Sequence, residues 1–181
     1  VSDMLWLAKA DNGQQVMKLT QCALEDEMTD LLEFFEALAD EKAVGLTLTG
    51  TAPDIMADRN MLRRAINNLL SNALRHAPEH SQIEVTLSEK KTGEDKQRFA
   101  CLQISNTGAP IPAEHLPHLF ERFYRADPSR HRSVDNPTDN SGLGLAITRS
   151  IVQLHQGKIR VESDQTSTRF FVTLPLEFEP S

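Results

Sequence analysis

Strand-like segments follow one another directly along much of this chain, and too few helices separate them for a doubly wound parallel sheet. Apolar and polar residues alternate at 43–50, 81–91 and 98–106, as is typical of half-buried strands. Two further strand-like segments, 157–164 and 168–176, close the chain as a hairpin. We therefore expect an α+β fold, a two-layer α/β sandwich whose single mixed, mostly antiparallel sheet is covered by helices on one face.

Helical spacing of apolar residues predicts the elements between these strands, together with two shorter strands. The first helix should end at Asn12 and Gly13. The third should end at Pro78, and the last at Gly157. The predicted helices cover 1–12, 24–42, about 59–77 and 142–157, and the shorter strands lie within 14–24 and 53–58.

The composition limits the classes of function that fit the chain. Its 181 residues suggest one domain with a short appendage, and its net charge of −7 argues against broad attraction to nucleic acid or anionic membrane. No apolar run approaches the ~18 residues of a membrane span, and no signal peptide is recognisable. Cys22 and Cys101 lie beside apolar residues, which favours buried thiols over a disulfide and fits a reducing cytosol.

Three asparagines lie among the leucines of the predicted helix 59–77, although Asn disfavours helix interiors. At about 100° per residue, the apolar residues gather on one side of this helix. Arg64, Asn68, Asn72 and Arg75 share the opposite side. A solvated polar face is one interpretation. The other is a site in which amide oxygens hold Mg²⁺ while the flanking arginines suit its phosphates.

Two glycine-containing segments surround a long basic stretch. "NSGLGLAI" opens the last helix, where backbone N–H groups can face an anion, although the G-x-G pattern of Gly142 and Gly144 also occurs often by chance. No apolar strand precedes them, which excludes a dinucleotide-binding fold. Residues 109–140 lack a regular pattern and are either a flexible surface loop or a lid. Four arginines crowd this stretch: Arg122, Arg125, Arg130 and Arg132.

Together these segments resemble the ATP-binding domain of sensor histidine kinases, in the superfamily shared with gyrase, the ninety-kilodalton heat-shock chaperone and MutL. "NNLLSNALRHAP" is similar to the N box of that family, "NTGAPIP" to its first glycine box, "FERFYR" to its F box and "NSGLGLAI" to its second glycine box. "STRFFVTLP" is similar to the closing strand. The resemblance covers roughly 54–176, with the order and spacing of the motifs intact, and implies a Bergerat-type ATP-binding fold.

The resemblance implies a role for each matching residue. Asn72 would coordinate Mg²⁺, and Asn106 would read the adenine amino group. Gly108 would permit close backbone approach, and Thr168 would support Asn106. His76 would lie near the sugar, and Ile111 and Phe123 would form apolar walls or lid anchors. The phosphates would be held by Asn68, Arg75, Arg125 and the second glycine box, which consists of Ser141, Gly142, Leu143, Gly144 and Leu145. Asn68, Arg75 and Arg125 would act in catalysis.

The chain departs from the family pattern at three positions. Asn106 stands where the family has Asp, and its amide oxygen can still accept from adenine while its NH₂ serves another acceptor. Pro110 and Asn140 each stand where Gly is usual. Hydrolytic relatives also carry a Glu that activates water, four residues before the metal-binding Asn. This chain has Asn68 there, and Asn cannot take a proton, so we expect ATP to be held intact.

The resemblance also implies a longer parent protein and the partners of that protein. Residues 1–12 resemble the end of a dimerisation-domain helix, leaving 13–181 as the catalytic domain, with a lid at about 112–141. No His has the neighbourhood of a phosphoacceptor, so the γ-phosphoryl group would pass to a histidine of the absent dimerisation domain and then to a response regulator. The expected parent is a membrane-anchored homodimer with this part in the cytoplasm, and it most resembles the copper- or silver-sensing branch. The fragment itself is expected to be a monomer.

Two other functions are compatible with the sequence. Asn106 and Pro110 are also compatible with a degenerate module that serves regulation only. A serine-directed anti-sigma kinase of the same superfamily fits the F box and the long lid less well. His115 and His118 are expected to be structural or exposed rather than metal ligands, and His155 is expected to make a favourable contact with a helix dipole.

Overall fold

The computed structural model describes residues 2–125 and 142–178 of the chain. Its elements follow the predicted order of helices and strands. They are α1 (Ser2–Asp11), β1 (Leu19–Cys22), α2 (Leu24–Glu41), β2 (Gly45–Gly50), β3 (Ile55–Asp58), α3 (Arg59–His76), β4 (Gln82–Thr92), β5 (Gln97–Thr107), the 3₁₀ turn η1 (Leu116–His118), α4 (Gly144–Leu154), β6 (Lys158–Ser163) and β7 (Ser167–Pro175).

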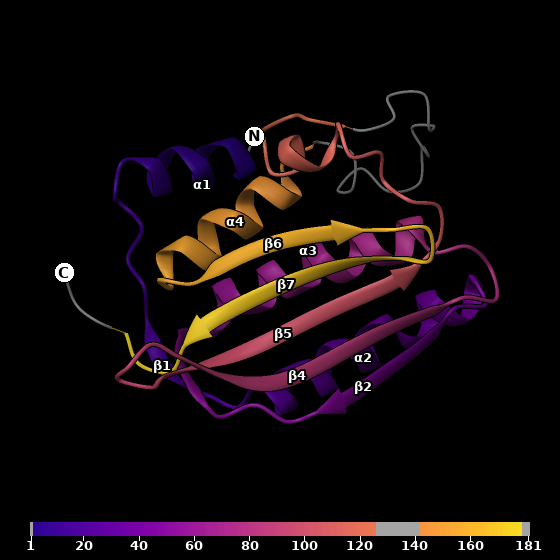
Figure 1. Cartoon of the computed structure of the whole chain (residues 1–181). Helices are drawn as coiled ribbons and strands as arrows, with labels where there is room; N and C mark the ends of the chain where they lie inside the picture. The colour runs from indigo at the N-terminus through magenta and orange to yellow at the C-terminus, as the bar shows by residue number, and fades with distance from the viewer. Residues whose placement is uncertain (1, 126–141, 179–181) are drawn as a thin grey trace.

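Five strands form one mixed sheet in the order β2-β4-β5-β7-β6. The β2–β4 pair is parallel, and the other neighbouring pairs are antiparallel. Helices α2, α3 and α4 lie behind this sheet in the view of Figure 1. Inward-facing Val85, Ile104 and Phe170 share a buried apolar cluster with Ile66 and Leu69 of α3. The predicted sandwich, with helices on one face of the sheet, is therefore confirmed.

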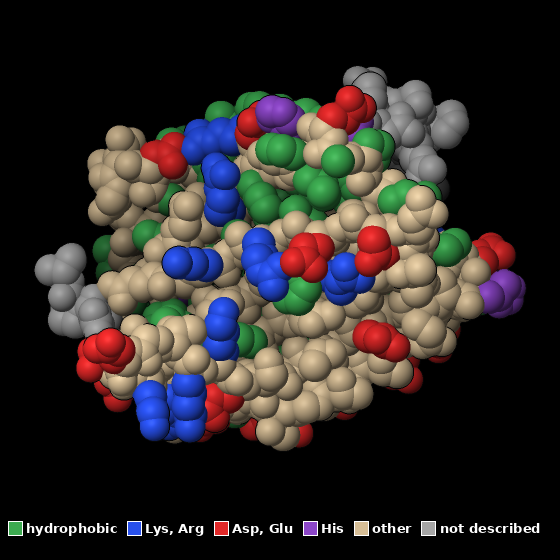
Figure 2. Space-filling model, viewed as in Figure 1, with side chains coloured by type: hydrophobic (Ala, Val, Ile, Leu, Met, Phe, Trp, Pro, Cys, Tyr) green, Lys and Arg blue, Asp and Glu red, His purple; other side chains and the backbone are tan. Residues whose placement is uncertain are grey.

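The opposite face of the sheet is turned to the viewer in Figure 2 and carries mostly polar side chains. Charged groups gather there over β6 and β7, where Arg169 pairs with Asp164 at 2.9 Å and with Glu162 at 3.7 Å. Gln103 and Ser105 of β5 are half-buried and alternate with fully buried neighbours. The alternation seen in the sequence thus separates a core face from a solvent face.

The small sheet at the start of α3 was not predicted. Strands β1 and β3 form a separate antiparallel pair, with Leu19 opposite Asp58, rather than joining the main sheet. Asp58 ends β3 and caps α3, since its carboxylate accepts from the Met61 N–H at 3.1 Å and from the Lys18 N–H at 2.9 Å. The β1–β3 pair therefore fixes the point at which α3 begins.

Helix α1 packs on the outside of α3 and α4. Leu7 is 1% exposed and lies in a second apolar cluster with residues of both helices, among them Ile147. Arg64 of α3 pairs with Asp3 at 2.6 Å, and its guanidinium lies over the ring of Trp6. α1 ends at Asp11, next to the predicted end. The assignment of this helix to a separate dimerisation domain stays a prediction.

His155 makes the predicted contact at the end of a helix, but as a neutral hydrogen-bond donor. The side chain is 4% exposed, and burial lowers the pKa of its imidazole, so it does not serve as a cation at the helix end. Its Nε2 accepts from the Asp58 N–H at 3.0 Å, and its Nδ1 bonds the Ile151 carbonyl at 2.7 Å. This pair of bonds requires the neutral tautomer with the proton on Nδ1. His155 therefore joins the end of α4 to the start of α3.

Other sequence-based expectations concern cysteines, histidines and membranes. Cys22 is buried and Cys101 half-buried, both as free thiols. His115 bonds the Tyr124 hydroxyl, and His118 lies 2.7 Å from Glu121, so both have structural partners. Within the described residues, no helix combines the length and apolar character needed to cross a bilayer.

Candidate functional site

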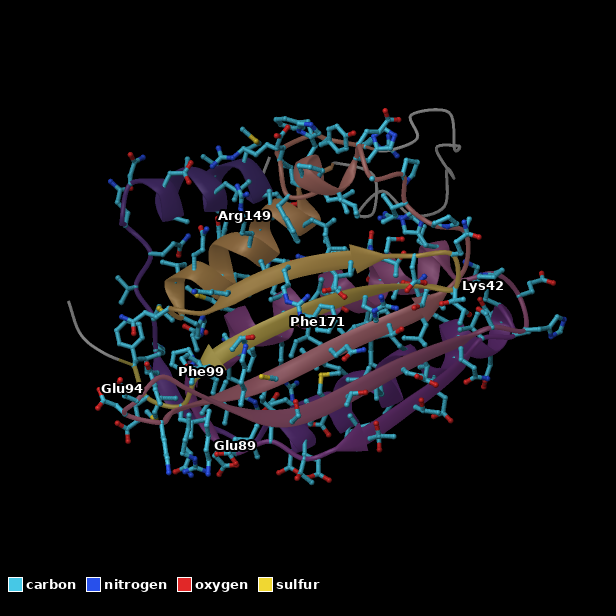
Figure 3. All side chains as sticks on the ribbon, in the orientation of Figure 1. Lys42, Glu89, Glu94, Phe99, Arg149 and Phe171 are labelled. Carbon is cyan, nitrogen blue, oxygen red and sulfur yellow. The ribbon has the colours of Figure 1, made fainter. Side chains whose placement is uncertain are left out.

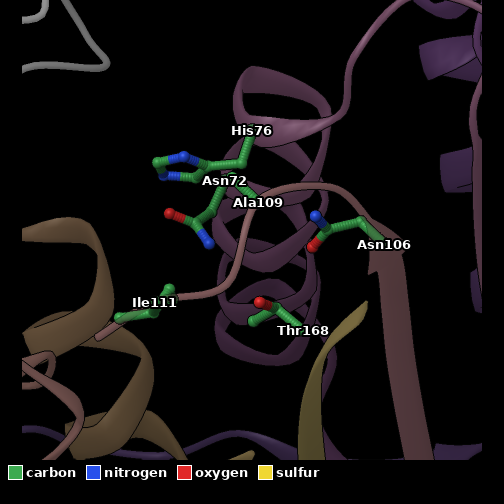
Figure 4. Close-up of a pocket in the computed structure, with 6 residues that line it drawn as sticks. All are labelled: Asn72, His76, Asn106, Ala109, Ile111 and Thr168. Atoms are coloured by element: carbon green, nitrogen blue, oxygen red, sulfur yellow. The ribbon is translucent and has the colours of Figure 1, made fainter. Parts of the chain in front are cut away.

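A pocket opens where β5 and β7 meet the end of α3. Six residues line it: Asn72, His76, Asn106, Ala109, Ile111 and Thr168 (Figure 4). All but Ala109 are predicted site residues, drawn from three motifs far apart in the sequence. Two of the six are apolar, and none is Asp, Glu, Lys or Arg. Such a lining suits a flat heterocycle bound by neutral hydrogen-bonding groups.

Asn106 and Gly108 shape the base of the pocket. Asn106 lies near the end of β5, faces inward, is 4% exposed, and stands opposite Thr168 in the sheet. Its Nδ2 donates to the Thr107 carbonyl at 3.4 Å. Gly108 follows with φ +151°, and a Cβ there would come within 3.2 Å of the His76 carbonyl oxygen. The glycine therefore lets the loop pass close to the end of α3.

A hydroxyl pair connects the two sides of the pocket. Thr168 Oγ1 lies 2.8 Å from Ser163 Oγ, and Ser163 Oγ accepts from the Ile111 N–H at 2.9 Å. The first glycine segment is thus attached to the β6–β7 hairpin. Ser163 was not predicted from the sequence, because its role depends on the hairpin register that places it opposite Thr168.

The polar stripe of α3 divides into two parts. Asn72 is 8% exposed and accepts from Arg75 Nη2 at 2.8 Å, and Asn68 donates to the Gly144 carbonyl at 3.1 Å. A freely solvated face is therefore wrong for these asparagines. Arg64, at the other end of the stripe, is instead held by Asp3 of α1. The sequence pattern alone does not separate the two parts.

The second glycine segment lies against the F box. A Cβ on Gly142, at φ +70°, would come within 2.8 Å of the Phe123 Cα, while the Phe123 N–H donates to the Gly142 carbonyl at 2.9 Å. Leu143 is buried, Leu145 is half-buried, and α4 begins at Gly144, two residues later than predicted. The α4 N-terminus therefore starts beside Asn68 and faces the polar part of α3.

The predicted lid residues lie in different surroundings. Phe123 is 57% exposed and is not among the residues that line the pocket. Arg122 pairs with Asp11 at the end of α1, and Arg125 is exposed at the edge of the described chain. Ser141 and the central lid, 126–141, lie outside the described residues.

Positive charge gathers at the end of α3. Lys42, which follows α2, donates to the carbonyls of Leu74 and Arg75 in the last turn of α3. Burial lowers the pKa of the Lys42 ammonium, and the charge of Arg75 lowers it further. Figure 3 shows Lys42 at the end of the molecule where β5 finishes. Lys42 belongs to none of the recognised motifs and was not predicted from the sequence.

Comparison with known proteins places this geometry in a family. Residues 57–178 match the model of the histidine kinase-, DNA gyrase B- and HSP90-like ATPases. Sensor histidine kinase CusS of Escherichia coli K12 is 45% identical over 97% of the chain, and the probable sensor kinase SilS of Salmonella typhimurium is also 45% identical over 97%. The chain spans 34% of the length of each of these relatives. Sensor protein CzcS of Cupriavidus metallidurans is 37% identical.

Solved structures share the fold. The catalytic domain of histidine kinase ThkA has a TM-score of 0.74 at 24% identity, covering 89% of this chain and 97% of that one. Full-length ShkA in complex with AMPPNP has a TM-score of 0.79 at 21% identity, covering 99% of this chain and 35% of that one. The predicted resemblance to sensor kinases of the heavy-metal branch is confirmed by the sequence relatives. From its motifs, its fold and these matches, the chain belongs to the histidine kinase-, DNA gyrase B- and HSP90-like ATPase family.

Proposed function

We propose that this chain binds Mg-ATP and donates the γ-phosphoryl group to a histidine on the dimerisation domain of a two-component sensor kinase. The observation that carries the proposal is the pocket, which brings Asn72, Asn106 and Thr168 together from three motifs. Family membership supports ATP binding, and the neutral lining suits the base.

Each part of the site has a role in this proposal. Asn106 would contact the base, supported by Thr168. His76 and Ile111 would flank the nucleotide, and Gly108 leaves room beside it. The phosphate end would use Asn68, Arg75, Arg125 and the backbone N–H groups at the start of α4, from Gly142 to Leu145. Ser141 belongs to the same proposed glycine box.

The donor set at Asn72 fits Mg²⁺. Asn72 supplies a neutral oxygen that is nearly buried and held by Arg75, and Mg²⁺ prefers oxygen ligands shared with phosphates and water. When bound, the ion would neutralise phosphate charge and orient the transferred group. Arg75 would then turn from Asn72 toward a phosphate.

Transfer needs positioning and charge neutralisation more than acid–base chemistry. A histidine nitrogen of the partner domain would form a bond to the γ-phosphorus as the bond to the β–γ bridging oxygen breaks. The arginines would offset the charge that develops on the leaving diphosphate. Asn68 offers no proton acceptor to water, so hydrolysis would be slow.

The proposal extends to the longer protein. Because the chain spans 34% of its curated relatives, the phosphoacceptor domain, the response regulator and the membrane anchor would lie in other segments or partners. We propose a membrane-anchored homodimer with this domain in the cytoplasm, no nucleic-acid partner, and a monomeric state for the isolated chain.

Calorimetric titration with the non-hydrolysable analogue AMPPNP, with and without Mg²⁺, tests the proposal. The chain should bind saturably, and Asn72→Ala should weaken binding at least about tenfold only when Mg²⁺ is present. Asn67→Ala, on the same helix outside the pocket, is the matched control and should bind normally. An absence of binding at millimolar nucleotide would contradict the proposal and favour the degenerate regulatory module.

A further inference from the structure

We infer that Asn106 lets this site accept 6-oxopurine nucleotides as well as adenine nucleotides, so that the chain binds purine nucleoside triphosphates with little discrimination at position 6 of the base. The inference rests on the proposed function, because it concerns the base end of the same nucleotide site. It goes further in naming which bases that end admits.

Asn106 presents a neutral amide where the pocket meets the sheet. The side chain comes from the inward face of β5, and Figure 4 shows its amide directed across the group of lining residues, toward Asn72. None of the six lining residues is an acid or an aliphatic base. The edge of a bound base would therefore meet one donor and one acceptor on Asn106 rather than a fixed charge.

The two classes of purine differ by an exchange of donor and acceptor. Adenine offers a donor at N6 and an acceptor at N1, whereas a 6-oxopurine offers an acceptor at O6 and a donor at N1. An amide matches adenine with Oδ1 toward N6 and Nδ2 toward N1. Turned by 180° about χ2, the same amide matches O6 and the N1–H. A carboxylate has only acceptors, so it would repel O6.

Little in the structure holds the Asn106 amide in one orientation. Within the described part of the chain, its side chain has one hydrogen bond, from Nδ2 to the Thr107 carbonyl, and its 3.4 Å length is at the long end of the usual range. In the neighbouring hydroxyl pair, either Ser163 or Thr168 can be the donor. The polar end of the pocket can therefore reverse its donors and acceptors without breaking a strong bond.

Competition calorimetry with ATP and ITP tests this inference. ITP carries the 6-oxo group and the N1–H but lacks the 2-amino group of guanine, so it isolates position 6. The two nucleotides are compared on the wild type and on Asn106→Asp, at about pH 8 so that an aspartate is ionised. Gln103→Glu is the control, since it adds the same charge to β5 on the outer face of the sheet.

The wild type should bind ITP within about tenfold of ATP. Asn106→Asp should weaken ITP relative to ATP by at least about a hundredfold, while Gln103→Glu leaves the ratio unchanged. Rejection of ITP by the wild type, or an unchanged ratio in Asn106→Asp, would overturn the inference while ATP binding still supports the proposed function. Failure of the wild type to bind either nucleotide would overturn both.

Discussion

At the scale of single residues, the pocket depends on a hydroxyl that lies outside the recognised motifs. Ser163 accepts the Ile111 N–H and bonds Thr168, so it connects the first glycine segment to the strand behind the proposed base site. Loss of this hydroxyl would leave the Ile111 N–H without its acceptor and free the loop to move. Ser163 is thus a positioning residue that acts through its neighbours.

Ser163→Ala should weaken AMPPNP binding about tenfold, because a lost hydrogen bond of this kind costs about 1–1.5 kcal/mol. Titration calorimetry measures the affinity, and Ser163→Thr should restore part of it by returning the hydroxyl. Ser105→Ala removes a hydroxyl from the outer face of the same sheet and should bind normally. Equal affinities for Ser163→Ala and the wild type would remove the positioning role.

The same residues show what sequence reasoning can reach. Asn72, Asn106 and Thr168 belong to ordered motifs, and the structure brings all three to one pocket. Ser163 and Lys42 carry no local signature. Their roles arise from the register of a hairpin and from the approach of α2 to the last turn of α3, which are tertiary facts.

At the scale of secondary-structure elements, His155 links two helices. Its neutral ring accepts from the backbone where α3 begins and bonds the last turn of α4. Burial lowers the folded-state pKa of this imidazole below its usual 6.5, although the charge of Asp58 opposes part of the shift. Below pH 6.5 the unfolded chain therefore binds more protons at His155 than the folded chain does. The stability that neutral His155 contributes is lost as the pH falls from 6.5 toward the lower folded-state pKa.

The melting temperature should accordingly fall on acidification from neutral pH to about pH 5.5, and His155→Gln should show a smaller fall from a lower starting value. Differential scanning calorimetry over this pH range makes the comparison. His80→Asn changes an exposed histidine and should keep the wild-type pH dependence. The same slope in wild type and His155→Gln would assign the acid sensitivity to other groups.

Elements differ in how far local sequence determines them. The spacing of apolar residues places α3 within one residue of its observed end, because helix periodicity and Pro78 act locally. The pairing of β1 with β3 in a separate sheet was not predicted, because strands of four residues can pair with any exposed sheet edge or with another short strand. The choice is made by contacts between segments about forty residues apart, including the bond from Lys18 to Asp58.

At the scale of the whole molecule, the functional groups gather at one end of a sheet whose other face is open to solvent. The pocket, the polar part of α3 and the start of α4 adjoin one another, while α1 attaches to the outside of α3 and α4. In the proposed function, this domain holds its nucleotide while the phosphoacceptor histidine lies in another domain. Until the γ-phosphoryl group is transferred, water must not attack the bound nucleotide.

The absence of a general base at position 68 is therefore testable through hydrolysis. Asn68 lies one turn before Asn72 and donates to the Gly144 carbonyl, but its amide cannot accept a proton from water. Asn68→Glu should raise phosphate release at saturating Mg-ATP by about a hundredfold or more, which is the typical contribution of a positioned base. Asn68→Gln has the same length without the base and should stay at the slow wild-type rate. Equal rates in the two variants would show that residue 68 does not restrain hydrolysis, and the intact nucleotide would then need another explanation, such as exclusion of water from the γ-phosphate.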